Sequence, residues 1–98
     1  MNMDEPFQLP IEPELDLHTF RPQDIKVVVL EYLEECRLKG ILEVRIVHGK
    51  GIGQLCRTVH GILATHADVI SFALAAGHYG GEGATFVRLR AKPRDPLS

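Results

Sequence analysis

Apolar residues in this chain follow two spacings that alternate along the sequence. Leu15 and Leu17 alternate with polar residues, as in a half-buried strand, whereas apolar residues between 25 and 36 recur every three or four positions, as in a helix. The expected strands are 15–18, 44–47, 69–74 and 84–89, and the expected helices contain 25–36 and 55–66. This β-α-β-α-β-β order predicts an α/β fold, a two-layer sandwich with a mixed sheet whose first two strands are parallel.

Residues 14–92 are expected to form one small domain. The chain has 98 residues, which is too short for two hydrophobic cores. Prolines and acidic residues in 1–13 predict an extended leader, and 93–98 is expected to form a C-terminal tail. No apolar run is long enough to span a bilayer and the first residues lack a basic signal segment, so we expect a cytoplasmic protein without membrane contact.

The charge of the chain is unevenly distributed. The formal net charge is −2, but residues 17–94 hold all eleven Lys and Arg and only seven acids, a net of +4. This balance permits nucleic-acid binding without requiring it. Cys36 and Cys56 are twenty residues apart without a CxxC pair, so we expect buried apolar side chains, not a zinc site or a disulfide.

The loop 48–53 has the composition of an anion-binding loop. Its glycines are Gly49, Gly51 and Gly53. Glycines allow the backbone to approach a ligand closely, and this loop leads directly into the amino end of a helix, where an anion is favoured. Lys50 adds a positive charge, and Arg57 would oppose the helix dipole unless a phosphate lay nearby. Such a loop can also serve only to turn the chain, and the spacing matches neither the P-loop nor the dinucleotide fingerprint.

Two histidines end the first two expected strands. His18 and His48 therefore lie at the carboxyl edge of the sheet, where ligands of α/β proteins bind, and neighbouring strands would bring the two imidazoles to one cleft. Asp16 shares a strand face with His18, and it could orient that imidazole, hold a divalent metal or pair with a base. His60, His66 and His78 are interpreted as structural or incidental.

Three short motifs together resemble the Smr (small MutS-related) domain family over roughly residues 15–91. They are Leu15-Asp16-Leu17-His18, His48-Gly49-Lys50-Gly51 and the closing Gly81-x-Gly83-Ala84-Thr85. The resemblance implies a compact α/β sandwich with a polar cleft built from the first two motifs. It also implies an endonuclease, since family members are described as nicking DNA or cleaving RNA, including messenger RNA on stalled ribosomes. The chain departs from the family pattern at Thr19, usually Gly, and at Cys56, usually Arg.

The expected activity is cleavage of a phosphodiester bond in DNA or RNA. His18 and His48 would exchange protons while Gly49, Lys50, Gly51, Gly53 and Arg57 hold the phosphate. RNA supplies a 2′-hydroxyl nucleophile and needs no metal, whereas DNA needs an attacking water, for which Asp16 could bind Mg²⁺ or Mn²⁺. The alternatives are a non-catalytic nucleic-acid or ribosome-binding adaptor and a small-anion or nucleotide site in a regulator. The scarcity of aromatic residues favours recognition through backbone and shape.

Overall fold

The computed structural model describes residues 13–49, 53–75 and 83–93. Most of the expected leader and tail, together with Lys50, Gly51, His78 and Gly81, lie outside the described residues. The elements run in the order β1 (Glu14–Asp16), a 3-10 turn (Pro22–Asp24), α1 (Ile25–Leu38), β2 (Glu43–Val47), α2 (Gln54–Thr65), β3 (Val69–Leu74) and β4 (Ala84–Leu89). This order confirms the predicted one.

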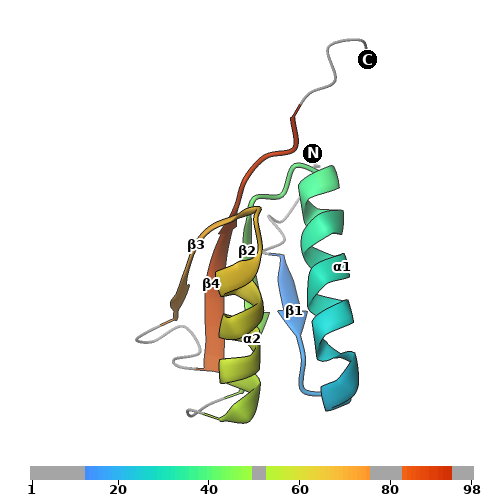
Figure 1. Ribbon diagram of the computed structural model, residues 1–98, viewed down its shortest axis with the longest axis vertical. Helices are drawn as coiled ribbons and strands as arrows, with labels where there is room; N and C mark the ends of the chain where they lie inside the picture. Colours follow the sequence, from blue (N-terminus) through green and yellow to red (C-terminus); the bar gives the residue numbers. More distant parts are fainter. Residues whose placement is uncertain (1–12, 50–52, 76–82, 94–98) are drawn as a thin grey trace, which may run out of the picture.

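The four strands form one mixed sheet in the spatial order β1-β2-β4-β3. β1 and β2 are parallel, as predicted, with Asp16 beside Val47. β4 lies between β2 and β3 and is antiparallel to both, with Thr85 beside Ile46 on one side and Leu74 on the other. Both helices cover the same face of the sheet, which gives the two-layer sandwich that the sequence predicted (Figure 1).

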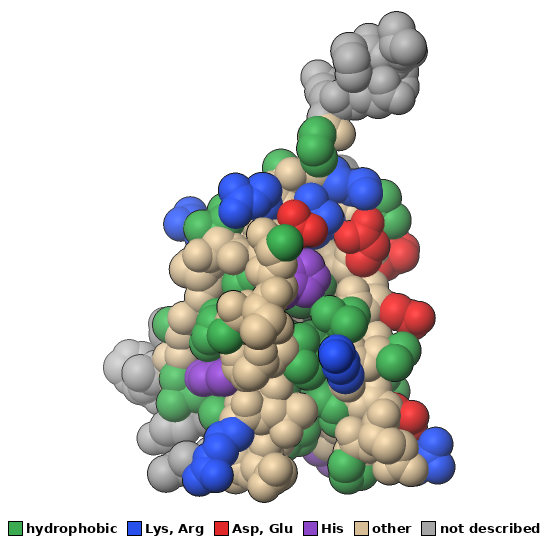
Figure 2. Space-filling view, in the orientation of Figure 1, with side chains coloured by type: hydrophobic (Ala, Val, Ile, Leu, Met, Phe, Trp, Pro, Cys, Tyr) green, Lys and Arg blue, Asp and Glu red, His purple; other side chains and the backbone are tan. Residues whose placement is uncertain are grey.

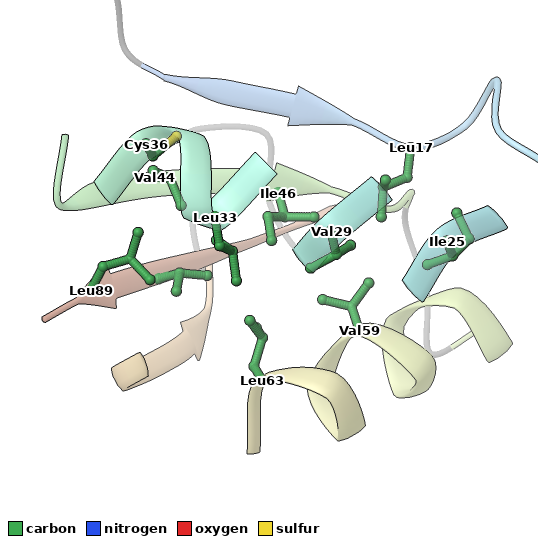
Figure 3. Packing of buried hydrophobic residues seen from close by; sticks show 11 residues of the cluster. Leu17, Ile25, Val29, Leu33, Cys36, Val44, Ile46, Val59, Leu63 and Leu89 are labelled. Atoms are coloured by element: carbon green, nitrogen blue, oxygen red, sulfur yellow. The ribbon is translucent and has the colours of Figure 1, made fainter. Parts of the chain in front are cut away.

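The core fills the space between the helices and this face of the sheet. It contains Leu17 beyond β1, Val29 and Leu33 of α1, Ile46 of β2 and Val59 of α2, each fully buried. Figure 3 shows these side chains pointing toward one another from the two layers. Val29 and Leu33 are one helical turn apart, so the three-or-four spacing of the sequence identifies the buried stripe of α1. Among the described residues, no helix is long and apolar enough to cross a membrane.

Two local features determine where α1 begins and ends. Pro22 occupies the first position of the 3-10 turn that leads into the helix, where its missing N–H costs no hydrogen bond. Gly40 follows the C-cap residue Lys39 with φ +75°, a left-handed conformation that glycine adopts without a Cβ penalty. The chain then returns directly into β2, which places the ends of β1 and β2 at the same edge of the sheet.

Candidate functional site

Asp16 and His18 form a hydrogen-bonded pair at the end of β1. The strand ends at Asp16, two residues earlier than predicted, and the carboxylate atom Oδ1 accepts hydrogen bonds from the His18 backbone N–H (3.0 Å) and from Nδ1 (2.8 Å). A carboxylate only accepts, so Nδ1 is the protonated nitrogen and Nε2 of the neutral ring carries the lone pair. The His18 side chain is 72% exposed, so this lone pair is accessible from solvent. Of the three roles left open for Asp16, the structure shows orientation of His18.

The same pair affects the ionisation of the carboxylate. The hydrogen bond from the His18 side chain, aided by the bond from its backbone N–H, lowers the pKa of Asp16 below its ordinary value. Hydrogen bonds to the charged form of an acid favour that form. Asp16 is therefore ionised around neutral pH and holds the His18 ring in one tautomer.

His48 lies in a different environment, on the helix-covered side of the sheet. Its ring is buried, Nδ1 donates to the carbonyl of Gly49 (3.1 Å), and Nε2 therefore accepts from the hydroxyl of Thr85 (2.8 Å). The backbone N–H groups of His48 and Gly49 both donate to the carbonyl of Gly83. Gly49 has φ +100°, a conformation that explains the glycine at this position. These bonds hold the first residues of the glycine loop against the start of β4.

His60 completes a buried cluster that the sequence did not reveal. The His60 atom Nε2 is 2.8 Å from Oγ1 of Thr85. Because the Thr85 hydroxyl donates its hydrogen to His48, the N–H of His60 is the donor in this second bond. The His60 ring lies 6.2 Å from His48 and 5.0 Å from Phe72, edge to face in both cases. Burial, and secondarily the proximity of His48, lower the pKa of His60. The only sequence signal was that His60 shares a helix face with Val59 and Leu63 of the core.

The two histidines of the predicted pair therefore lie in different environments, His18 exposed to solvent and His48 buried. Leu17 and His48 face the helices and are buried, whereas Asp16 and His18 face solvent. The parallel register aligns Asp16 with Val47, and His18 lies in the turn that follows β1. Within the described ranges, no hydrogen bond or ring contact joins His18 to His48. The structure shows two hydrogen-bonded groups at this sheet edge, Asp16–His18 and His48–Thr85–His60, and the convergence of the two imidazoles on one cleft stays a prediction.

The amino end of α2 follows the loop that begins at His48, and His60 lies further along the same helix. Gly53 is its N-cap, with extended backbone (φ −79°, ψ 175°) and no side chain to cap the helix, and the first turn contains no acid. Backbone N–H groups of this turn are thus available to an anion. Arg57 is exposed in the next turn and, among the residues that the structure describes, it makes no ion pair. Basic side chains lie at both sides of this end of the molecule, the lower end in Figures 1 and 2.

A small hollow lies next to the start of α2. Its volume is about 180 Å³, and its walls are largely apolar. The lining residues are Phe20, Pro22, Ile25, Gln54, Leu55 and Thr58. Two of its lining residues are near candidate site residues in the sequence. Phe20 follows His18 by two residues, and Gln54 is the first residue of α2. The hollow therefore lies between the first residues of the two helices.

This chain is similar to known proteins over most of its length. The Smr domain model matches residues 15–90. The endonuclease MutS2 of Pelotomaculum thermopropionicum is 39% identical over 79 residues, and that of Geobacillus thermodenitrificans is 40% identical over 77 residues. These matches cover 81% and 79% of this chain but 10% of each relative, so the chain spans about a tenth of the length of these relatives.

Two crystal structures share the fold. The Smr domain of Thermus thermophilus MutS2 superposes with a TM-score of 0.74 at 37% identity, covering 80% of this chain and 98% of that one. YdaL, a stand-alone small MutS-related protein from Escherichia coli, superposes with a TM-score of 0.72 at 29% identity, covering 83% of this chain and 66% of that one. The matched region contains every site residue described above.

Proposed function

The chain belongs to the Smr domain family, and from this premise and the site geometry we propose that it is an endonuclease that cleaves RNA. The proposal draws on the relatives named endonuclease MutS2, which are homologous over this domain. The observation that carries it is the 2.8 Å hydrogen bond between Asp16 and His18, which leaves Nε2 of an exposed imidazole able to accept a proton. This arrangement is typical of a general base at a surface cleft.

The phosphate would be held by the amino end of α2. Its uncapped first turn begins at Gly53 and supplies backbone donors, Arg57 supplies a positive charge, and the loop residues Gly49, Lys50 and Gly51 complete the proposed phosphate contacts. Phosphate contacts of this kind position a nucleic acid without reading its sequence. We therefore propose recognition of the backbone.

The proposed reaction transfers the phosphoryl group within the RNA. Nε2 of His18 takes the proton of a 2′-hydroxyl, the 2′-oxygen attacks the adjacent phosphorus, and the 5′-oxygen leaves with a proton from solvent. The products are a 2′,3′-cyclic phosphate and a 5′-hydroxyl. Asp16 contributes by stabilising the imidazolium that forms at His18.

His48 has a positioning role in this proposal. Both of its ring nitrogens are already bonded within the protein, to Gly49 and to Thr85, so the ring holds the glycine loop and does not meet the substrate directly. This replaces the exchange of protons between two histidines that the sequence suggested. His48→Ala should consequently weaken both binding and turnover by releasing the loop.

The geometry also bears on the choice between RNA and DNA. Oδ1 of Asp16 accepts two hydrogen bonds from His18, so this oxygen is committed to orienting the base. Cleavage of DNA would instead require an attacking water, with Asp16 as a ligand of Mg²⁺ or Mn²⁺. The pair therefore favours RNA and a metal-independent reaction.

Cleavage of end-labelled single-stranded RNA tests the proposal. The assay compares wild type with His18→Ala and with His66→Ala as a matched control, since His66 lies at the other end of α2. Each protein is assayed with EDTA, with Mg²⁺ and with Mn²⁺, on RNA, on an otherwise identical oligonucleotide with one 2′-deoxy position and on supercoiled DNA. We expect wild type and His66→Ala to cleave RNA in EDTA, leaving cyclic phosphate ends, and His18→Ala to lose about 10²–10⁴-fold in rate.

Three outcomes would overturn this proposal in distinguishable ways. Cleavage at the 2′-deoxy position would exclude the 2′-hydroxyl as nucleophile, and metal-dependent nicking of plasmid would identify a DNA enzyme. Salt-sensitive binding without cleavage in all conditions would identify the protein as an adaptor for nucleic acid or ribosomes. Full activity of His18→Ala would remove that residue from the mechanism.

A further inference from the structure

The His48–Thr85–His60 cluster contains a third potential metal ligand, Cys56. Cys56 and His60 are four residues apart on α2, so the helix places both side chains on one face, and Cys56 Sγ lies 3.9 Å from His60 Nε2. One potential ligand atom from each of His48, Cys56 and His60 lies within 4.8 Å of the other two. Cys56 and His48 are buried and His60 is half-buried.

We propose that His48, Cys56 and His60 form a binding site for a zinc ion, with a fourth position open to the Thr85 hydroxyl or to a water. Two imidazole nitrogens and one thiolate form a donor set that suits Zn²⁺ and does not suit the hard cations Mg²⁺ and Ca²⁺. This inference goes beyond the proposed cleavage of RNA, which uses no metal. It also differs from the expectation drawn from the lack of a CxxC pair.

The spacing of the three ligand atoms is compatible with a shared metal ion. Bonds of about 2.0–2.3 Å to zinc put neighbouring ligand atoms roughly 3.3–3.6 Å apart, so the three ligand atoms need to approach by at most about 1.5 Å. We propose that rotation of the side chains supplies this approach, with the backbone of β2 and α2 unchanged. On metal binding, the Thr85 hydroxyl would lose its hydrogen bonds to the two imidazoles and would lie beside the ion.

The tautomer of His48 is already the one that a metal requires. Its Nδ1–H donates to the carbonyl of Gly49, which leaves the lone pair on Nε2, the atom that faces the cluster. Metal-bound histidines usually donate their other ring N–H to a carbonyl or carboxylate in this way. His60, whose Nε2–H donates to Thr85 in the metal-free protein, would carry its ring proton on Nδ1 when it binds the metal through Nε2.

Retention of metal by the intact protein tests the inference. Chelator-treated protein is loaded with Zn²⁺ or Co²⁺, passed through gel filtration and analysed by mass spectrometry for metal content. We expect about one ion per chain in wild type, and in the cobalt protein an absorption band from a thiolate ligand. The variants Cys56→Ser and His60→Gln should lose at least about tenfold in affinity, whereas the matched controls Cys36→Ser and His66→Gln should bind like wild type.

A second readout needs no variant and so does not depend on variant folding. Zn²⁺ should slow alkylation of Cys56 relative to the metal-free protein and leave alkylation of Cys36 unchanged. Cys36 lies on α1 and is buried in the hydrophobic core, and this burial raises the pKa of its thiol. Absence of retained metal, absence of the thiolate band, or equal affinity in Cys56→Ser and wild type would overturn the zinc site. The RNA cleavage assay in EDTA is unaffected by that result, so the two proposals fail separately.

Discussion

The chemistry that we propose for this domain depends on three consecutive residues at the end of β1. Leu17 is fully buried and donates its backbone N–H to Val47, while Asp16 and His18 on either side of it face solvent. The buried leucine therefore anchors the segment and gives its polar neighbours one orientation. An exposed Asp–His pair gains little stability from its charge. The role that we propose for the pair is to fix the tautomer and the orientation of the His18 imidazole.

Removal of the His18 side chain should raise the pKa of Asp16 toward the ordinary value of an aspartate. The hydrogen bond from that side chain is the largest cause of the lowered pKa. An NMR titration of the Asp16 carboxyl carbon in wild type and His18→Ala measures the effect, with Thr19→Ala as a control that keeps the pair. An unchanged Asp16 pKa in His18→Ala would show that the pair does not form in solution.

The sign of the accompanying pH dependence follows from the direction of this shift. Folding lowers the pKa of Asp16, so the folded protein binds this proton less readily than the unfolded chain. The contribution of the pair to stability is thus present above the unfolded pKa and is lost as the pH falls through the lowered folded value. Chemical denaturation at a series of acidic pH values should show a smaller decline for His18→Ala than for wild type.

At the scale of elements, α2 serves three functions with different parts of its surface. Val59 and Leu63 pack into the core, the face with Cys56 and His60 joins the buried cluster, and the amino end beside Gly53 is open to an anion. Core packing fixes the rotation of the helix, and this rotation determines where the other two surfaces point. A change in packing would therefore alter the proposed phosphate site and the cluster together.

Arg57→Gln should weaken binding of single-stranded RNA and reduce its dependence on salt. Loss of one phosphate contact lowers the slope of log K against log salt by about 0.7 for a single strand. Fluorescence anisotropy over a range of salt concentrations measures this slope. Lys39→Gln is a matched control, since Lys39 is exposed at the far end of α1. Equal slopes for Arg57→Gln and wild type would exclude a phosphate contact at Arg57.

At the scale of the whole molecule, Arg37 ties the end of α1 to two other parts of the fold. Its side chain is 6% exposed, pairs with Asp68 at 3.0 Å just before β3, and donates to the carbonyl of Arg90 at 2.8 Å just after β4. Glu34 on the same helix also pairs with the guanidinium. These bonds lie at the end of the sandwich opposite to the candidate site, so they contribute to the fold without touching the proposed chemistry.

Arg37→Met should lower the free energy of unfolding by about 1–3 kcal/mol, because it leaves the carbonyl of Arg90 without its side-chain donor and removes a charge partner from Asp68. Urea denaturation measures the change, with Lys39→Met as an exposed control that should have little effect. RNA cleavage by folded Arg37→Met should match wild type. A stability equal to that of wild type would mean that the buried contacts of Arg37 contribute no net stability.

The sequence by itself determined the order of the elements of this protein and indicated that Asp16 and His18 lie together, whereas their role in a site stays a prediction. Spacing identified both helices, the bounds of β3 and β4, and the shared face of Asp16 and His18, because these features depend on contacts within a few residues. Tertiary structure decided the insertion of β4 between β2 and β3, which sets Thr85 beside Ile46 and brings it within reach of His48 and His60. No local pattern encodes this pairing, since strand register arises from packing between segments far apart in the chain.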